Sequence, residues 1–304
     1  MAEERDFRKL LQARWDQGRN VCIGLDTDPV KLPNGISDVH AFNVEIIKAT
    51  APYASSYKPN AAFYEANGPQ GWEDLNRLML YARAHYPEIP FLYDAKRGDN
   101  ANSNGGYVHS IFDRLGFDAV TVHPYMGSEA LKPFLDRGDK GIIVVVRTSN
   151  PGASEIEDLE IGLSEEQSAD LAEGPSGSTP DLAEFATGAL DHTLMLPLHR
   201  VIALKVANHW NTNGNCCAVV GATCPDHLKA VRGIIREMPI LIPGVGAQGG
   251  DLERAVINGR NSQGDGIILS SSRGIIYASR GPDFAEAAAA KASEMNALIQ
   301  SFRQ

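Results

Sequence analysis

The stretch "FLYDAKRGDNAN" (91–102) begins with apolar residues that favour a β-strand and runs directly into charged residues at positions 94, 96, 97 and 99. Successive side chains of a strand alternate between its two faces, so Asp94 and Lys96 are predicted to point to the same side. Charges at the end of a strand need either compensation or a use. The stretch therefore predicts a strand that delivers a set of charges to one place.

Seven further apolar runs resemble the start of this stretch. The eight predicted strands are 21–26, 54–60, 89–96, 119–125, 141–148, 216–223, 240–246 and 265–272. Most are almost continuously apolar, as is typical of parallel strands covered on both faces. Helix-like stretches such as 71–86 and 224–238 lie between them, and this alternation indicates βαβ units. We predict an α/β fold, a (β/α)8 TIM barrel, with a doubly wound sheet as the alternative.

Length and composition are consistent with a single barrel domain over residues 1–304. Hydrophobic residues make up 43% of the chain, and the net charge is -10. That charge argues against broad binding to nucleic acid or to an anionic membrane, both of which favour a basic surface. The charged N-terminal segment is predicted to form an amphipathic helix, not a signal peptide. No run approaches the roughly 18 apolar residues of a membrane span.

Cysteine usage points to a reducing compartment. The four cysteines are Cys22, Cys216, Cys217 and Cys224. They show no CxxC spacing, and the first three lie in apolar, strand-like runs, where adjacent Cys216 and Cys217 should face opposite sides. We interpret them as buried free thiols and predict a cytoplasmic location.

One connection is much longer than the others. Residues 151–215 separate the fifth and sixth predicted strands, as an extended insertion after strand 5. We predict a mobile, acidic first half and a helical second half. The acidic half, 151–182, is interpreted either as a solvated linker or as part of a closure over the site.

Polar residues cluster at the carboxyl ends of the predicted strands, which is where barrels carry their catalytic groups. Lys58 ends the second strand, beside the pair Asp94 and Lys96, so a chain of alternating lysines and carboxylates through Asp99 is expected. Such a chain supplies a fixed negative charge beside an ammonium group that can donate a proton. The alternative is an ion-pair network that only stabilises the barrel, although desolvation can cancel the Coulomb gain of such a network.

The loops after the seventh and eighth strands indicate an anion site. "IPGVGAQGGD" (242–251) is rich in small residues, and "SSSRGIIYA" (270–278) places Arg273 just after the last strand. Barrels commonly bind phosphate at these two loops, through backbone N–H groups and a charged side chain. A metal site is not predicted, because histidines and carboxylates do not cluster and the lysines compete for the acids. His123 lies at a strand end, and either packing or direct contact with a ligand is open to it.

Taken together, these residues resemble the orotidine 5'-phosphate decarboxylase family. "DAKRGD" (94–99) matches its Asp-x-Lys-x-x-Asp signature. The resemblance is closest to the longer bacterial (type 2) subgroup and covers roughly residues 24–278. Its other motifs here are "VVVRTSNPGA" (144–153), "VVGATCPDHL" (219–228), "IPGVGAQGGD" and "SSSRGIIYA".

The resemblance implies a barrel enzyme that decarboxylates orotidine 5'-phosphate to UMP in pyrimidine synthesis. It implies a homodimer with no metal and no organic cofactor. The implied catalytic residues are Lys58, Asp94, Lys96 and Asp99. Lys96 would protonate C6, Asp94 would lie near the substrate carboxylate, and Asp99 would reach the partner's site.

The implied substrate-binding residues are Asp26, Ser103, Thr148, Ser149, Pro243, Gly246, Gln248 and Arg273. Asp26 would bind the ribose and Ser149 the pyrimidine ring, while Gln248 and Arg273 would bind the phosphate. Two positions depart from the family pattern, since Asn100 and Ser103 stand where Ile and Thr are usual.

Two other functions remain open at this stage. The first is a metal-dependent phosphosugar enzyme of the same superfamily, a hexulose-phosphate synthase or a keto-gulonate-phosphate decarboxylase. The second is a non-catalytic nucleotide-binding barrel.

Overall fold

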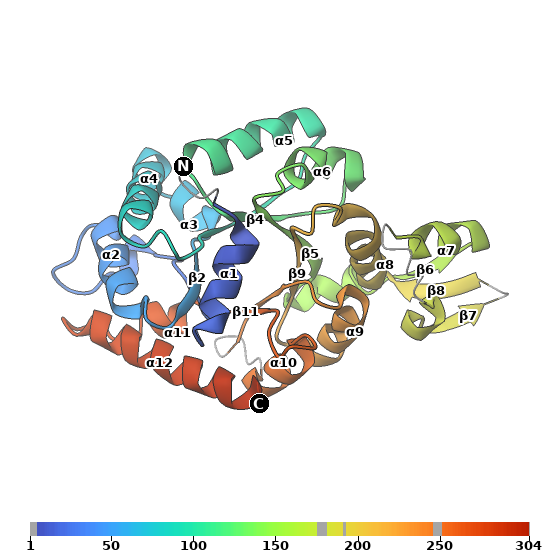
Figure 1. Ribbon diagram of the computed structural model, residues 1–304. Helices are drawn as coiled ribbons and strands as arrows, with labels where there is room; N and C mark the ends of the chain where they lie inside the picture. The colour runs from blue at the N-terminus through green and yellow to red at the C-terminus, as the bar shows by residue number, and fades with distance from the viewer. Residues whose placement is uncertain (1–4, 175–180, 191–192, 246–250, 304) are drawn as a thin grey trace.

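The computed structural model describes residues 5–174, 181–190, 193–245 and 251–303. Figure 1 shows strands at the centre with helices around them. The eight barrel strands are β1 (Val21–Gly24), β2 (Ala54–Lys58), β3 (Leu92–Arg97), β4 (Ala119–Val122), β5 (Gly141–Arg147), β9 (Cys216–Val220), β10 (Ile240–Pro243) and β11 (Ile267–Ser271). Each of the eight predicted strands is therefore confirmed.

The barrel is parallel and closed. The strand order is β2-β1-β11-β10-β9-β5-β4-β3, and every neighbouring pair is parallel. Parallel bridges from Tyr57 to Phe91 and from Asn60 to Asp94 join the two outer strands of that order. The predicted (β/α)8 barrel is thus confirmed, and the doubly wound alternative is wrong.

Helices cover the outside of the barrel (Figure 1). The α-helices are α1 (Phe7–Asp16), α2 (Val39–Thr50), α3 (Ala61–Glu65), α4 (Gly68–His85), α5 (Ala101–Val108), α6 (Gly127–Leu135), α7 (Glu165–Ala172), α8 (Leu198–Lys205), α9 (Pro225–Ile235), α10 (Leu252–Gly259), α11 (Arg273–Ile276) and α12 (Phe284–Arg303). Shorter segments are η1 (Pro29–Lys31), the π-helical η2 (His109–Arg114) and η5 (Val206–Trp210), and the 3₁₀ turns η3 (Pro151–Glu155) and η4 (Leu182–Phe185). None of these described helices is both long and apolar enough to cross a membrane.

Helix α1, predicted from the charged N-terminal segment, closes the amino end of the barrel. Its Phe7, Leu11 and Trp15 belong to the same buried cluster as inward-facing strand residues such as Cys217. Gly141 allows this close approach, because a Cβ there would lie 2.4 Å from the Phe7 ring. The opposite, carboxyl end of the barrel is left for a site.

The cysteines follow the predicted pattern in part. Cys22, Cys216 and Cys217 are buried free thiols, whereas Cys224 is half-buried. Cys216 belongs to the layer between barrel and helices and Cys217 to the barrel interior, so the two do face opposite sides. Burial raises the pKa of both thiols to about 12, which makes them poor nucleophiles.

The connection between β5 and β9 carries strands that the sequence did not predict. A three-stranded antiparallel sheet is formed by β6 (Glu160–Leu163), β7 (Gly188–Leu190) and β8 (Thr193–Pro197), in the order β6-β8-β7. Together with α7 it projects to one side of the barrel (Figure 1). The strands are only three to five residues long, which is too short to give a clear periodic signal. The predicted helical second half is confirmed as α8 and η5.

Candidate active site at the carboxyl end of the barrel

A cavity of about 310 Å³ opens among the carboxyl ends of the strands. It is lined by Asp26, Lys58, Asn60, Asp94, Lys96, Thr121, Thr148, Ser149, Asn150, Val219, Leu241, Pro243, Gly244, Val245, Ser270, Ser271, Ser272 and Arg273. Its size is within the range of pockets that hold small ligands. Polar side chains dominate, which indicates a polar or charged ligand.

Asp94 lies at the centre of the charged groups. Its Oδ2 accepts from Lys58 Nζ at 2.9 Å, and its Oδ1 accepts from Lys96 Nζ at 2.6 Å. The Thr121 hydroxyl donates to the same Oδ1 at 3.0 Å. The structure therefore brings together the first three members of the predicted chain, with both lysines on one carboxylate. The predicted continuation to Asp99 is not formed, since Asp99 makes no ion pair within the described part of the chain.

Burial and mutual attraction keep this array ionised. Burial alone lowers the pKa of Lys58 and raises that of Asp94. The attraction between them outweighs burial, with Asp26 also acting on Lys58 and Lys96 on Asp94, so the pKa of Lys58 is raised and that of Asp94 is lowered. Lys96 differs from Lys58 in exposure, at 42% against 5% for the side chain. Of the two ammonium groups, Lys96 is thus the one open to a ligand.

The backbone at Lys96 is unusual. Its φ is 44°, in the left-handed region that L-residues rarely adopt. The pairing of β3 with β4 also shifts register between Tyr93 and Arg97. Thr121 Oγ1 accepts the Lys96 N–H at 2.9 Å and so supports this conformation. The predicted pairing of Asp94 with Lys96 is confirmed, but through an irregular strand end, a pattern that is common where function fixes a backbone.

Asp26 follows β1 and presents an oxygen to the cavity. Its Oδ2 accepts from the Ser272 hydroxyl at 2.7 Å. Its Oδ1 is buried and has no hydrogen-bond partner among the described residues. Gly24 makes room for this contact, because a Cβ there would lie 2.5 Å from Ser272 Oγ. A buried carboxylate oxygen without a donor is suited to accept a ligand hydroxyl.

Described residues of both predicted anion loops line the cavity. Arg273 begins α11, is exposed, and makes no ion pair within the described part of the chain. Pro243 and Gly244 follow from β10, and Gly244 has a φ of 89°. The predicted ligands Gly246 and Gln248 lie outside the described residues. An uncompensated guanidinium at the rim favours an anionic group of the ligand.

Thr148, Ser149 and Asn150 form the wall that follows β5. Thr148 lines the cavity, yet its hydroxyl donates to Glu157 Oε1 at 3.0 Å. The hydrogen of this hydroxyl is therefore directed to the insert, and binding of substrate by Thr148 stays a prediction. Ser149 lies beside it in the lining, where the sequence analysis placed it.

Asp99, Asn100 and Ser103 are not among the residues that line this cavity. Asn100 is the N-cap of α5, and its side chain accepts the Ser103 N–H at 3.1 Å. Asn is a favoured N-cap residue, which gives a structural reason for Asn100 where the family usually has Ile. Asp99 Oδ1 accepts the Asn100 N–H at 2.7 Å. A role for Asp99 in a partner subunit stays a prediction.

Several residues line the cavity that were not predicted from the sequence. Thr121 lies inside β4, and only its place on the inward face of that strand marks it out. Asn60 and Asn150 follow β2 and β5, where the strand-end rule applies to them as well. His123 is exposed and lies outside the lining, so packing in the core is wrong for this residue.

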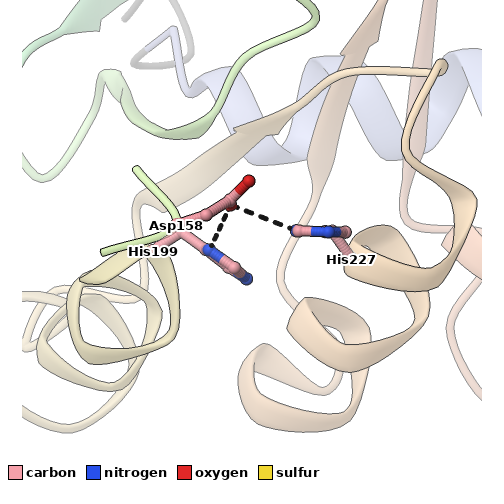
Figure 2. Close-up of side chains that lie close together, drawn as sticks. All are labelled: Asp158, His199 and His227. Carbon is pink, nitrogen blue, oxygen red and sulfur yellow. Dashed lines mark ion pairs between the residues drawn. The ribbon is translucent and has the colours of Figure 1, made fainter. Parts of the chain in front are cut away.

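A second polar cluster lies outside the cavity, where the insert meets the barrel. Asp158, His199 and His227 lie within 4.8 Å of one another (Figure 2). Their ligand types suit a divalent metal. However, both Asp158 oxygens accept from Arg147, at 2.8 and 2.9 Å, and His199 Nδ1 donates to the Glu157 carbonyl at 2.9 Å. The Asp158 oxygens and His199 Nδ1 are thus occupied by protein groups, whereas His199 Nε2 and His227 Nδ1 have no hydrogen-bond partner among the described residues. We describe the cluster as a junction between the insert and the barrel.

Comparison with known sequences supplies the family. Residues 19–178 match the profile of the "Orotidine 5'-phosphate decarboxylase / HUMPS family". The orotidine 5'-phosphate decarboxylase of Azoarcus sp. (strain BH72) is 37% identical over 302 residues, 98% of this chain and 99% of the relative. That of Thermomicrobium roseum is 41% identical over 304 residues, 98% and 96% of the two chains. The chain belongs to this family.

Solved structures of the family agree with the fold. The OMP decarboxylase of Leishmania donovani aligns with a TM-score of 0.75 at 31% identity, covering 98% of this chain and 99% of that one. A putative orotidine-monophosphate decarboxylase from Toxoplasma gondii gives a TM-score of 0.76 at 32% identity, with 99% and 98% covered. Both alignments cover nearly the whole of each chain.

Proposed function

We propose that the protein decarboxylates orotidine 5'-phosphate to UMP, as its curated relatives are named for doing. The observation that carries the proposal is the Lys58–Asp94–Lys96 array on the wall of a polar cavity. The array combines a fixed carboxylate with an exposed ammonium group 2.6 Å away. Breaking the bond between C6 and the carboxylate leaves an electron pair on C6, and a neighbouring ammonium group both stabilises that charge and provides the proton.

We assign Lys96 as the proton donor, because its side chain is the more exposed of the two lysines. Asp94 would lie next to the substrate carboxylate and disfavour it relative to the carbanion. Lys58 holds Asp94 in its charged form. The array carries a net positive charge, because two cations flank a single anion, and the substrate carboxylate would balance that charge when it enters.

The remaining contacts follow from charge and hydrogen-bonding capacity. Asp26 Oδ1 would accept a ribose hydroxyl, and Arg273 would bind the phosphate. Ser149 would contact the pyrimidine ring. Phosphate binding far from C6 provides energy that can close the site and exclude water.

A metal-dependent phosphosugar reaction is the second candidate, since the family profile also includes HUMPS in its description. Such an enzyme needs carboxylate oxygens free for the metal. Here both Asp94 oxygens already accept from lysines, which favours the metal-free decarboxylase. A nucleotide-binding barrel without turnover is the third.

One assay separates the three functions. The absorbance change of orotidine 5'-phosphate is followed with purified protein, with and without EDTA. Turnover insensitive to EDTA supports the proposal. Turnover that requires Mg²⁺ supports the metal-dependent enzyme, and tight UMP binding without turnover supports the binding protein.

We also propose that the protein is a homodimer in which Asp99 serves the partner's site, and the position of Asp99 outside its own cavity supports this. We propose a single domain over 1–304, with 151–215 as an extension, and the packing of α8 on β5 and α9 supports it. The third proposal is a cytoplasmic location. The free thiols support the third. Sedimentation of the wild-type protein, and complementation between Lys96→Ala and Asp99→Ala subunits, test the shared site.

A further inference from the structure

Glu157 and Asp158 of the insert contact the end of β5 at the active-site wall. Glu157 Oε2 accepts the Thr148 N–H at 2.7 Å, and Oε1 accepts the Thr148 hydroxyl at 3.0 Å. A single carboxylate therefore binds both polar hydrogens of a residue that lines the cavity. Hydrogen bonds to a charged acceptor are stronger than neutral ones, so Thr148 is firmly held.

Arg147 completes the contact from the other side. Its Nε and Nη2 donate to Asp158 Oδ1 and Oδ2 at 2.8 and 2.9 Å, the paired geometry typical of arginine and carboxylate. Its Nη1 donates to the Thr148 carbonyl. The Arg147 side chain is only 8% exposed. We call this set the insert clamp, and it consists of Arg147, Thr148, Glu157 and Asp158. Within it, the N–H, the hydroxyl and the carbonyl of Thr148 all have hydrogen-bond partners.

The clamp is braced on the barrel and not on the projecting sheet. The backbone N–H and Nδ1 of His199, at the start of α8, both donate to the Glu157 carbonyl at 2.9 Å. His199 Nδ1 is also 3.2 Å from Asp158 Oδ1. A dashed line joins these two side chains in Figure 2. His227 on α9 lies near the same carboxylate oxygen, with Nδ1 3.6 Å from Asp158 Oδ1, and its ring centroid is 4.7 Å from that of His199. Both helices pack against the barrel, so the clamp has a fixed base.

Ser149 is confined between the clamp and the neighbouring strand end. A Cβ at Gly221, just after β9, would lie 2.7 Å from both the backbone nitrogen and the Cβ of Ser149. Gly221 N–H also donates to the Arg147 carbonyl at 2.9 Å. The backbone of Ser149 has almost no freedom on the Gly221 side. On its other side Ser149 is joined directly to Thr148, which the clamp holds.

We propose that Glu157 is a positioning residue, which holds Thr148 so that Ser149 is set against the substrate ring. The inference rests on the proposed decarboxylase function and extends it to the insert. It assigns a task to the acidic half of the insert, which a solvated linker would not have. The task is fixed support of the wall, in place of closure over the site.

The decisive experiment is a double-mutant cycle between Glu157→Ala and Ser149→Ala, with kcat and KM for orotidine 5'-phosphate as readouts. A displacement of about 1 Å at a substrate contact costs on the order of 10²-fold, so each single variant should lose about 10- to 100-fold in kcat/KM. If Glu157 acts through Ser149, the double variant should be no worse than Ser149→Ala, within about twofold. If the two residues have independent roles, the fold-losses in kcat/KM of the two single variants should instead multiply in the double variant.

Three variants test whether the effect is one of position. Glu157→Gln keeps an acceptor oxygen for the Thr148 N–H and should recover most of the activity that Glu157→Ala loses. Thr148→Val keeps the shape, removes only the hydroxyl, and should lose several-fold. If Glu157→Ala does not fold, Thr148→Val still tests the contact between Thr148 and Glu157. Glu166→Ala, at an exposed acidic residue of the same insert, is the matched control and should retain wild-type kinetics.

The outcomes are distinct. The positioning role is overturned if the wild-type protein turns over orotidine 5'-phosphate and both Glu157→Ala and Thr148→Val keep its kcat/KM. The proposed decarboxylase function would still stand in that case. Losses that multiply in the double variant also overturn the positioning role. No turnover of orotidine 5'-phosphate by the wild-type protein overturns both proposals together. Losses that do not multiply, with rescue by Glu157→Gln, support it.

Discussion

The ends of β3 and β5 form two walls of one cavity, and they use charge in opposite ways. At β3 one carboxylate is held by two ammonium groups, and Lys96 remains exposed to a ligand. At β5 two carboxylates from the insert hold a backbone segment and an arginine, and the charges face away from the cavity. The same ion-pair chemistry thus presents reactive groups at one wall and fixes main-chain geometry at the other. Variants at β3 should therefore affect chemistry, and variants near β5 should affect placement.

The largest effect is expected from Lys96→Ala, which removes the exposed ammonium group of the β3 wall. Loss of a proton donor alone costs about 10²–10⁴-fold in rate, and loss of charge stabilisation adds to it, so kcat should fall by at least about 10³-fold. Circular dichroism should remain that of the wild type. Lys132→Ala, at an exposed lysine paired with Asp136 on α6, is the control and should keep full activity. Near-normal turnover by Lys96→Ala would refute Lys96 as the proton donor.

Substitution of the two aspartates of the β3 motif, Asp94 and Asp99, should have different effects on the free energy of unfolding. Asp94→Asn leaves Lys58, 5% exposed, without its charged partner, and breaking a buried pair in this way costs about 3–5 kcal/mol. Asp99→Asn removes a carboxylate that has no ion pair among the described residues, so the free energy of unfolding should stay within about 0.5 kcal/mol of wild type. Urea unfolding of both variants measures the difference. Equal stabilities would mean that Asp94 is not needed to hold Lys58.

The β3 wall was more predictable than the β5 wall, for physical reasons. Asp94 and Lys96 are two residues apart, so strand periodicity alone brings them together, and the barrel topology adds Lys58. Glu157 and Thr148 are nine residues apart across an irregular turn, and no local pattern specifies that contact. The left-handed backbone of Lys96 was also unpredictable, since only its bond to Thr121 on another strand explains it. The short strands of the insert gave no periodic signal.

Acid should lower the free energy of unfolding of the protein through His199, which lies beside the insert clamp near the end of β5. Burial comes first among the causes that lower the pKa of His199 to about 4, with the neighbouring His227 contributing, although Asp158 and the Glu157 carbonyl act in the opposite direction. An unfolded histidine titrates near 6.5, so between pH 6.5 and 4 the unfolded chain binds a proton that the native protein does not. Stability is therefore lost as the pH falls through this window, by about 3 kcal/mol from this residue.

Urea unfolding between pH 7 and 4.5 measures that loss. His199→Gln should flatten the dependence on pH, whereas His109→Gln, at a histidine with a side chain 61% exposed, should leave it as in the wild type. A slope that persists in His199→Gln would assign the acid sensitivity to other groups. The β3 array should contribute only at lower pH, because the pKa of Asp94 is lowered from an already acidic value.

The smallest effect is expected from Asn100→Ala, which tests whether this departure from the family pattern is a helix cap or part of the chemistry. Its side chain accepts the Ser103 N–H at the start of α5, and loss of such a cap costs about 1 kcal/mol. Thermal unfolding should show that loss, while kcat/KM stays within about twofold of wild type. Asn102→Ala, at an exposed position on the same helix, should change neither. A fall in kcat well beyond twofold would instead place Asn100 with the reacting groups. The reactive part of the β3 wall would then extend past Lys96 and Asp99 to Asn100.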